Sequence, residues 1–308
     1  MLIILSAGPL SVIQDLGRKG YQHLGVSPGG PMDEHAFSWA NRLLDNPINT
    51  PCVEITIGMF RAQFTHETTF ALTGAQMAGT LNGKKIAPWQ SYHAYANDTL
   101  ELRGASSGTR AYLAVKGGFC VPNILGSSAT VMRDELGGLT TKGEALKAND
   151  CLPYPNTPLM MRRQTPPQFI PAYSPKVTLD LIASYQFDWF TKAQHQRFFD
   201  SEYTLTPHCD RMGFRLSGTP IVCHQQRLIS EGTALGAVQI PADGQPIILM
   251  RDRQTIGGYP KLGCLSAQSV NQLAQSQPGT HITFRLISLE NAIEQQRQEQ
   301  RFFQHYVG

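Results

Sequence analysis

Short segments in which apolar and polar residues alternate run through most of this chain, and they limit its fold more than any other feature. In the first half, segments of this kind lie at residues 10–13, 52–57, 60–64, 69–73, 99–102 and 110–115, and the apolar residues 1–5 read as a further strand. Asn82 and Gly83 form an Asn-Gly pair, which is the strongest short-range signal for a β-hairpin. Many short strands separated by turns are typical of a β-sandwich or a β-barrel. The sequence therefore predicts a mainly β protein.

A chain of 308 residues is longer than one hydrophobic core usually requires, so we expect two domains. Seven prolines fall between residues 153 and 175, and this density is typical of a connector. The β pattern then resumes at residues 176–182, 203–205, 213–217, 230–241, 246–250 and 281–286. We predict an N-terminal domain at residues 1–160 and a C-terminal domain at residues 161–308.

A few helices are expected between the strands. Asp33 has the side chain of an N-cap, and residues 34–44 follow it with their apolar residues on one helical face. An aromatic-rich stretch at residues 187–199 predicts a second helix, and Ser266 predicts the N-cap of a third. Residues 289–306 are mostly Gln, Glu and Arg with a thin apolar stripe, so they predict an exposed helix.

Composition argues against several classes of function. The net charge is only +3 and the basic residues are scattered, so nothing indicates nucleic-acid binding. No apolar run approaches the roughly 20 residues that a membrane-spanning helix needs. Residues 1–5 lack the features of a signal peptide, so we expect a cytoplasmic protein. The six cysteines have no metal-ligand spacing, so we expect free, buried thiols and no metal site.

A glycine-rich loop between the strand at residues 10–14 and the first helix gathers one group of candidate binding residues. Glycine permits a positive φ and a close approach of the backbone to a ligand. The candidates in and around this loop are Gln14, Asp15, Arg18, Ser27, Gly29 and Asp33. Tight turns alone would explain the same glycines, and this alternative stays open.

A second polar group follows the apolar strand that ends at residue 250. Asp252 has the chemistry of a base or a hydrogen-bond acceptor, and Arg253 offers a planar fork for a carboxylate, an amide or a phosphate. Four neighbours suit a small polar ligand or would turn backbone amides toward it: Gln254, Thr255, Gly257 and Gly258. In the alternative interpretation, Asp252 pairs with Arg253 as a loop clamp and the glycines form only a turn.

Weaker candidates lie at two strand ends that carry a hydroxyl and a glycine, at Thr73 with Gly74 and at residues 230–233. Turn formation by itself explains either of them. The sequence has no P-loop, no Gly-Xaa-Ser-Xaa-Gly elbow and no His-Glu-Xaa-Xaa-His motif. It also lacks the Met-Lys pair of a biotin-attachment hairpin, so any biotin would be carried by another polypeptide.

A series of motifs then fits one pattern in order: QDLGRKG at residues 14–20, SPGGPMD at 27–33, ANRL at 40–43, Glu54, LTGA at 72–75, YLAVKGG at 112–118, LGS at 125–127, RMGFRLSG at 211–218, GAVQIP at 236–241 and DRQTIGGYP at 252–260. The series resembles the allophanate hydrolase subunit 2 family, also called the biotin-dependent carboxyltransferase family, over almost the whole chain. One departure is LTTKGE at residues 139–144, where family members often carry an arginine. A ligand role for the loop at residues 139–150 is therefore in doubt.

This resemblance implies two cyclophilin-like β-barrel domains and a place in a bacterial ATP-dependent 5-oxoprolinase. It implies as partners the A and B subunits of that enzyme, of which the B subunit is related to allophanate hydrolase subunit 1. The reaction would open 5-oxoproline to glutamate, with ATP bound by this chain or by one of its partners. Relatives in urea amidolyase transfer a carboxyl group from carboxybiotin to urea, so biotin enters only under that alternative. A third alternative is a non-catalytic regulatory partner of a subunit 1-like kinase inhibitor.

The 5-oxoprolinase hypothesis is favoured because this sequence contains neither a biotin carboxylase domain nor a biotin carrier domain. Charge that develops on an activated amide oxygen needs stabilisation, which arginines could supply. We expect catalytic roles for Asp252, Arg18 and Arg211. We expect substrate binding by Gln14, Asp15, Ser27, Gly29, Asp33, Thr73, Gly74, Gln239, Gln254, Thr255, Gly257, Gly258 and Tyr259.

Overall fold

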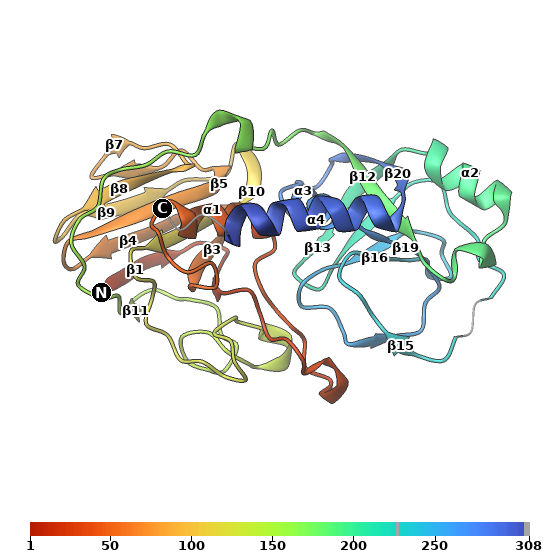
Figure 1. Ribbon diagram of the computed structural model, residues 1–308, viewed down its shortest axis with the longest axis horizontal. Helices are drawn as coiled ribbons and strands as arrows, with labels where there is room; N and C mark the ends of the chain where they lie inside the picture. Colours follow the sequence, from red (N-terminus) through yellow and green to blue (C-terminus); the bar gives the residue numbers. More distant parts are fainter. Residues whose placement is uncertain (226–227, 305–308) are drawn as a thin grey trace. The chain divides into compact units, whose positions relative to one another are not determined.

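The computed structural model describes residues 1–225 and 228–304, without the side chain of the last of these. Its chain divides into two compact units, which are described separately (Figure 1). The first unit contains Met1–Lys19, Pro28–Tyr173 and residues 303–304. The second contains Gly20–Ser27 and Ser174–Phe302, so the middle of the glycine-rich loop belongs with the second unit. The domain limits near residue 160 stay a prediction.

Two antiparallel sheets enclose the core of the first unit. One has the order β11–β1–β4–β9–β6–β7, with β11 Cys151–Leu152, β1 Leu2–Ala7, β4 Phe60–Phe64, β9 Thr99–Leu102, β6 Thr80–Leu81 and β7 Lys84–Lys85. The other has the order β2–β3–β10–β5–β8, with β2 Leu10–Gln14, β3 Cys52–Thr56, β10 Ser107–Val115, β5 Thr68–Gln76 and β8 Gln90–Ala94. Side chains from both sheets form a single apolar cluster. The two sheets of this unit therefore share one hydrophobic core.

Helix α1 (Glu34–Arg42) packs against β3, β5 and β10 (Figure 1). This explains why β5 is buried at nearly every residue, since the core covers one face of the strand and α1 covers the other. The predicted N-cap is confirmed, because the Asp33 carboxylate accepts a hydrogen bond of 3.0 Å from the backbone N–H of Ala36. The predicted hairpin is confirmed as well, with Asn82 and Gly83 at positive φ between β6 and β7.

The second unit is a closed barrel with the strand order β12–β19–β16–β17–β14–β13–β20. Its strands are β12 Lys176–Ala183, β13 Tyr203–Cys209, β14 Gly213–Ser217, β16 Ala237–Gln239, β17 Ile247–Leu249, β19 Lys261–Leu265 and β20 His281–Ile287. Only the β12–β20 pair is parallel among these neighbours. A separate two-stranded ribbon pairs β15 (Glu231–Gly232) with β18 (Ile256–Gly257). The expected mainly β fold is confirmed.

Helix α3 (Ala267–Ala274) packs against β12 and begins at the predicted cap, where the Ser266 hydroxyl accepts a hydrogen bond from Ser269 N–H. Helix α4 (Leu289–Gln304) confirms the predicted C-terminal helix, although residues 305 and 306 of that prediction lie outside the described residues. The single helix predicted at residues 187–199 is wrong. A 3-10 turn at Phe187–Trp189 is followed by extended Phe190, and Thr191 caps a separate helix α2 (Lys192–Asp200).

The six cysteines are free, as expected, but only Cys52 and Cys223 are buried, whereas Cys120 and Cys151 are exposed. The prediction of buried thiols is therefore wrong for Cys120 and Cys151, and Cys209 and Cys264 are only partly buried. Within the described part of the chain, no helix is long and apolar enough to cross a membrane. The same residues contain no group of three or more His, Cys, Asp or Glu side chains arranged to hold a metal ion.

Candidate functional site in the second barrel

The Asp15 carboxylate ties the start of the glycine-rich loop to a distant segment of the first unit. It accepts hydrogen bonds from Gly17 N–H at 2.9 Å, from Ser128 N–H at 2.6 Å and from the Ser127 hydroxyl. Asp15 itself is 2% exposed. Both oxygens of the Asp15 carboxylate are therefore bonded to donors inside the protein, so Asp15 anchors the loop.

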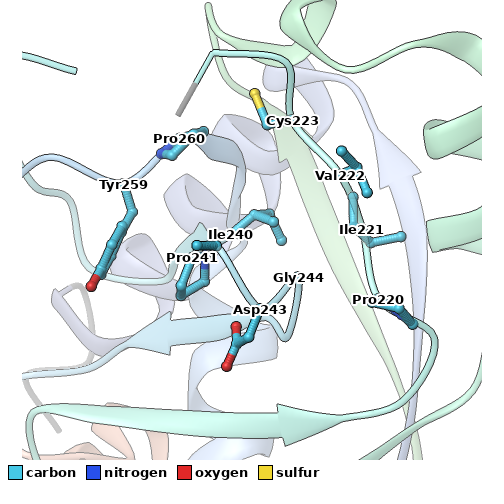
Figure 2. Close-up of a pocket in the computed structure, with 11 residues that line it drawn as sticks. Pro220, Ile221, Val222, Cys223, Ile240, Pro241, Asp243, Gly244, Tyr259 and Pro260 are labelled. Carbon is cyan, nitrogen blue, oxygen red and sulfur yellow. The ribbon is translucent and has the colours of Figure 1, made fainter. Parts of the chain in front are cut away.

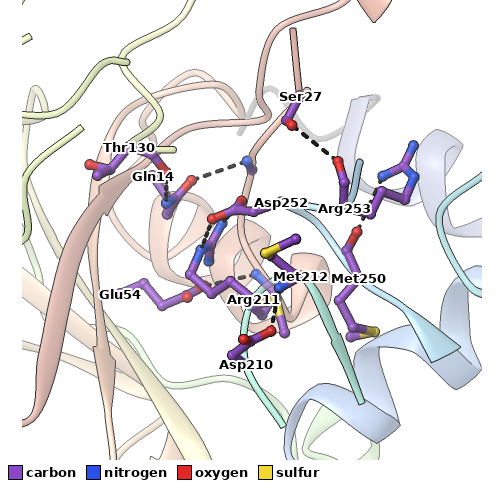
Figure 3. Close-up of polar contacts among 12 residues, drawn as sticks. Gln14, Ser27, Glu54, Thr130, Asp210, Arg211, Met212, Met250, Asp252 and Arg253 are labelled. Carbon is purple, nitrogen blue, oxygen red and sulfur yellow. Dashed lines mark hydrogen bonds and ion pairs between the residues drawn. The ribbon is translucent and has the colours of Figure 1, made fainter. Parts of the chain in front are cut away.

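Gln14 and Arg18 also join the start of the glycine-rich loop to residues 124–130. The Gln14 side chain donates to the Thr130 carbonyl at 2.9 Å and accepts from Gly30 N–H at 3.1 Å (Figure 3). The buried Arg18 guanidinium donates through Nε to the Ile124 carbonyl at 3.1 Å and through its Nη2 atom to the Ser127 carbonyl at 3.3 Å. Backbone carbonyls are neutral acceptors, so this arginine holds the 124–130 segment.

Glycine is required at two positions beside Arg18. Gly29 and Gly137 both have positive φ, and a Cβ on Gly29 would lie 2.8 Å from Val131 Cγ2. A Cβ on Gly137 would lie 2.0 Å from the Ala129 carbonyl oxygen and 2.3 Å from the Arg18 Nη2 atom. The two glycines thus permit close packing around Arg18, which is a structural reason for glycine other than a tight turn.

The other first-unit candidates surround helix α1. The Thr73 hydroxyl donates to the Ala36 carbonyl at 2.6 Å, and Asp33 caps the helix as described above. Gly74 has a φ of 85°, and its missing Cβ would lie 2.3 Å from the Arg110 carbonyl oxygen. Each of these residues therefore has a local structural partner, and their substrate-binding roles stay predictions.

Glu54 and Tyr112, which the motif series contained without a role, form a buried pair beside α1. The Glu54 carboxylate accepts hydrogen bonds of 2.7 Å from Met32 N–H and from the Tyr112 hydroxyl. The same hydroxyl accepts a hydrogen bond of 2.8 Å from Asp33 N–H. Burial raises the pKa of Tyr112 well above its ordinary value, and the negative charge of Glu54 raises it further. Tyr112 therefore stays a neutral phenol that joins Glu54 to the helix N-terminus.

In the second unit, Arg211 and Asp252 form a buried two-pronged ion pair (Figure 3). Arg211 Nε lies 2.8 Å from one carboxylate oxygen of Asp252, and the Nη2 atom lies 2.9 Å from the other. The backbone N–H of Asp252 also donates to the Arg211 carbonyl at 2.8 Å. The clamp weighed from the sequence thus exists, but its arginine is Arg211 and not Arg253. A carboxylate bridged in this way is better placed to hold a loop than to accept a proton.

Arg253 points its guanidinium toward backbone carbonyls of the second unit. Its Nε donates to the Thr233 carbonyl and its Nη1 atom to the Met250 carbonyl, both at 3.3 Å. Burial lowers the pKa of Arg253 to about 10, and the nearby charge of Arg251 acts in the same direction. The Arg253 carbonyl in turn accepts a 3.0 Å hydrogen bond from the Ser27 hydroxyl (Figure 3). Ser27 is therefore joined to the second polar group, not the first.

The Gln239 side chain differs from all of these. It is 1% exposed, and its Nε2 atom has no hydrogen-bond partner among the described residues. A Cβ on Gly257 would lie 2.8 Å from that nitrogen and 3.5 Å from Gln254 Nε2. The Gln239 and Gln254 carboxamides thus both lie near the position that a side chain at residue 257 would occupy. Neighbouring Thr255 has its carbonyl bonded to Thr233 N–H at 3.0 Å.

A charged network that sequence reasoning missed lies next to Gln239. Lys261, which is paired with Gln239 across β16 and β19, donates from Nζ to Glu231. The Glu231 carboxylate also accepts from Gln186 Nε2 at 2.6 Å and from the Tyr185 hydroxyl. The only sequence signal was the weak candidate at residues 230–233, which contains Glu231. Lys261 gave no signal because a lysine at a strand end usually faces solvent.

The Glu231 network gives a pH-dependent prediction. Burial favours the neutral acid, but the hydrogen bonds from Lys261 and Tyr185 and the lysine charge together lower the pKa of Glu231 below its ordinary value of 4.5. Ionised Glu231 therefore stabilises the fold above about pH 4.5, and this stabilisation is lost as the pH falls through the lowered pKa. Thermal unfolding of Glu231→Gln should occur at a lower temperature than in the wild type at pH 7.

The difference in unfolding temperature should shrink as the pH falls from 4.5 toward 3. The exposed Glu290 on α4 provides a control, since Glu290→Gln should unfold close to the wild-type temperature throughout. A Glu231→Gln difference that stays constant from pH 7 to pH 3 would show that the network does not depend on ionised Glu231.

The last candidates, Gly258 and Tyr259, lie at the end of the ribbon. Tyr259 is 49% exposed and lines a cavity of about 430 Å³ whose walls include Cys223, Ile240 and Asp243 (Figure 2). This cavity has a mixed apolar and acidic lining, and its position differs from that of the Gln239 amide. The structure thus brings Gln239, Gln254 and Gly257 together and leaves Tyr259 at a separate surface hollow.

Comparison with known proteins places the chain in a family. The model of the family described as the carboxyltransferase domain, subdomain A and B, matches residues 24–286. The chain belongs to this carboxyltransferase family. The resemblance expected from the motif series is therefore confirmed, and the matched range includes Gln239, Gln254 and Gly257.

Among similar family members is the 5-oxoprolinase C subunit of Escherichia coli, which is 35% identical over 99% of this chain and 97% of that protein. The protein of the same name from Haemophilus influenzae is 34% identical over 97% of this chain and 96% of its own length. The solved structure of Kluyveromyces lactis urea amidolyase matches 98% of this chain with a TM-score of 0.92 and 26% identity. This chain spans 20% of that much longer protein.

Proposed function

We propose that this chain is the C subunit of a bacterial ATP-dependent 5-oxoprolinase, which opens 5-oxo-L-proline to L-glutamate. The observation that carries the proposal is the 35% identity to a 5-oxoprolinase C subunit over nearly the full length of both chains. Partners would be the A and B subunits of that enzyme, the latter related to allophanate hydrolase subunit 1. ATP would be bound within that complex, and a cytoplasmic location belongs to the same proposal.

The second barrel supports an amide substrate in particular. The Gln239 and Gln254 carboxamides lie beside Gly257, and Lys261 is the strand partner of Gln239. Such groups suit a neutral oxygen acceptor. Arg211 and Asp252 bond each other, and Arg18 bonds backbone carbonyls, so all three catalytic candidates have structural partners. Catalytic roles for Arg18, Arg211 and Asp252 therefore receive less support than binding by Gln239 and Gln254.

Biotin-dependent carboxylation of urea is the second candidate function, because the fold matches urea amidolyase with a TM-score of 0.92. It is the weaker candidate, since the identity is lower and this chain corresponds to only part of that protein. Biotin would be required under this alternative only, and it would be carried by another polypeptide.

Reconstitution with the A and B subunits encoded in the same organism distinguishes these functions. We expect glutamate release from 5-oxo-L-proline that requires ATP and all three chains, and no dependence on added biotin carrier. Omitting this chain is the matched control. Release of glutamate at the same rate without this chain, or carboxylation of urea with a biotin carrier in place of glutamate release, would contradict the proposal.

A further inference from the structure

The unpaired amide of Gln239 is the feature of the second barrel that most needs a partner. Its Nε2 atom is buried and has no hydrogen-bond partner within the described part of the chain. Leaving a buried donor unpaired is costly, and natural proteins rarely do so without a bound water, an ion or a functional reason. The donor therefore marks a place where an oxygen acceptor is expected.

The backbone of Gly257 packs closely against that donor. A Cβ at this position would be 2.8 Å from Gln239 Nε2, 3.1 Å from Thr233 Cγ2 and 3.5 Å from Gln254 Nε2. The φ of Gly257 is not in the left-handed region, so its backbone does not require glycine. The need for glycine is spatial, because any side chain here would press on the Gln239 amide.

The strand pairing places two charged residues, Lys261 and Glu231, near Gln239 and Gly257. Gln239 is opposite Lys261 across β16 and β19, and residues directly opposite each other project from the same face of a sheet. Glu231 is opposite Gly257 across β15 and β18, and its carboxylate accepts a hydrogen bond from Lys261 Nζ. Lys261 is thus paired with Glu231, so the ligand group that suits this place is a neutral, polarisable oxygen and not a second carboxylate.

We propose that Gln239, Gln254, Gly257 and Lys261 form an amide pocket that binds the carbonyl oxygen of a small cyclic amide. The proposal rests on the proposed function and names the residues that hold its substrate. A lactam is a cis amide, so its N–H and C=O lie on one edge and match the N–H and C=O of a glutamine carboxamide. Lys261 stabilises negative charge on the lactam oxygen when the amide is activated.

The kinetics of the reconstituted three-chain complex test this pocket. Gln239→Met keeps the volume and removes the donor, and we expect it to raise KM for 5-oxo-L-proline about 10- to 100-fold. Gly257→Ala should raise KM as well, because its Cβ would press on the Gln239 amide and displace Nε2. Gly232→Ala is the matched control in the same ribbon, since a Cβ there meets no atom within 4 Å. Exposed Gln268→Met controls for the change of residue type.

Thermal unfolding separates a binding role from a structural one. Removing an unpaired donor does not cost a hydrogen bond, so Gln239→Met should unfold at the wild-type temperature or above it. If Nε2 only holds a structural water, Gln239→Met should unfold at a lower temperature while KM stays unchanged, which would overturn the proposal. An unchanged KM in both Gln239→Met and Gly257→Ala would also overturn it.

Three small probes test which part of the ligand is recognised. Competitive inhibition by 2-pyrrolidinone, which has the lactam without the carboxylate, should be lost in Gln239→Met. Cyclopentanecarboxylate, which has the carboxylate without the amide, should not inhibit, and inhibition by it that depends on Gln239 would overturn the proposal. If wild-type complex releases no glutamate, the proposed function fails, and titration of the full chain with 2-pyrrolidinone and urea then tests the pocket by itself.

Discussion

Replacing Asp252 with alanine is expected to lower the free energy of unfolding of the chain by about 3–5 kcal/mol. Its two oxygens lie 2.8 and 2.9 Å from the Arg211 guanidinium, and both side chains are almost completely buried. The truncation would leave the arginine charge buried without its carboxylate, and desolvating an unpaired charge is costly. Urea denaturation of the full chain, followed by circular dichroism, measures the change.

A double variant separates the ion pair from the loop that carries it. Arg211→Met with Asp252→Leu removes both charges, and paired apolar substitutions of this kind are often far less destabilising than loss of one partner. We therefore expect the double variant to recover most of the loss. If Asp252→Ala unfolds at the wild-type urea concentration but abolishes glutamate release by the complex, Asp252 is catalytic and the clamp interpretation is wrong.

Replacing Gly137 with alanine is expected to destabilise the first unit by more than about 2 kcal/mol. Positive φ alone costs a non-glycine residue about 1 kcal/mol. The added Cβ would also lie 2.0 Å from the Ala129 carbonyl oxygen and 2.3 Å from the Arg18 Nη2 atom, so the loop and the guanidinium would both have to move.

Gly126 provides a matched control for Gly137. It also has positive φ, at 79° against 77°, but a Cβ on Gly126 would meet no atom within 4 Å. Gly126→Ala should therefore show the backbone cost alone. Equal losses in the two variants, measured by urea denaturation, would show that close packing against Arg18 contributes nothing to the stability of this loop.

Much of the fold was predictable because local signals agree with the tertiary structure. Alternation of apolar residues located most strands, and Asp33 and Ser266 cap helices as their residue types predict. The error at residues 187–199 has a local cause, since Thr191 is itself a good N-cap and begins a new helix after an extended residue. Aromatic content alone did not reveal that break.

The candidate site was predictable only in part. Gln239, Gln254 and Gly257 were expected from the motif series, and the structure brings them together. Arg211 and Asp252 were also expected, but their mutual pairing depends on two loops 41 residues apart meeting in space. The Lys261–Glu231 pair was missed because it depends on the register of two strand pairs, which no local pattern contains.

The side-chain amide signal of Gln239 in a ¹⁵N–¹H correlation spectrum of the full chain reports directly on the ligand that we propose. Titration with 5-oxo-L-proline should shift this signal in a saturable manner, and 2-pyrrolidinone should move it in the same direction. The signal should be absent in Gln239→Met and should not respond in Gly257→Ala. A Gln239 amide that does not respond to either lactam, under conditions where the complex releases glutamate, would contradict binding of the substrate in the second barrel.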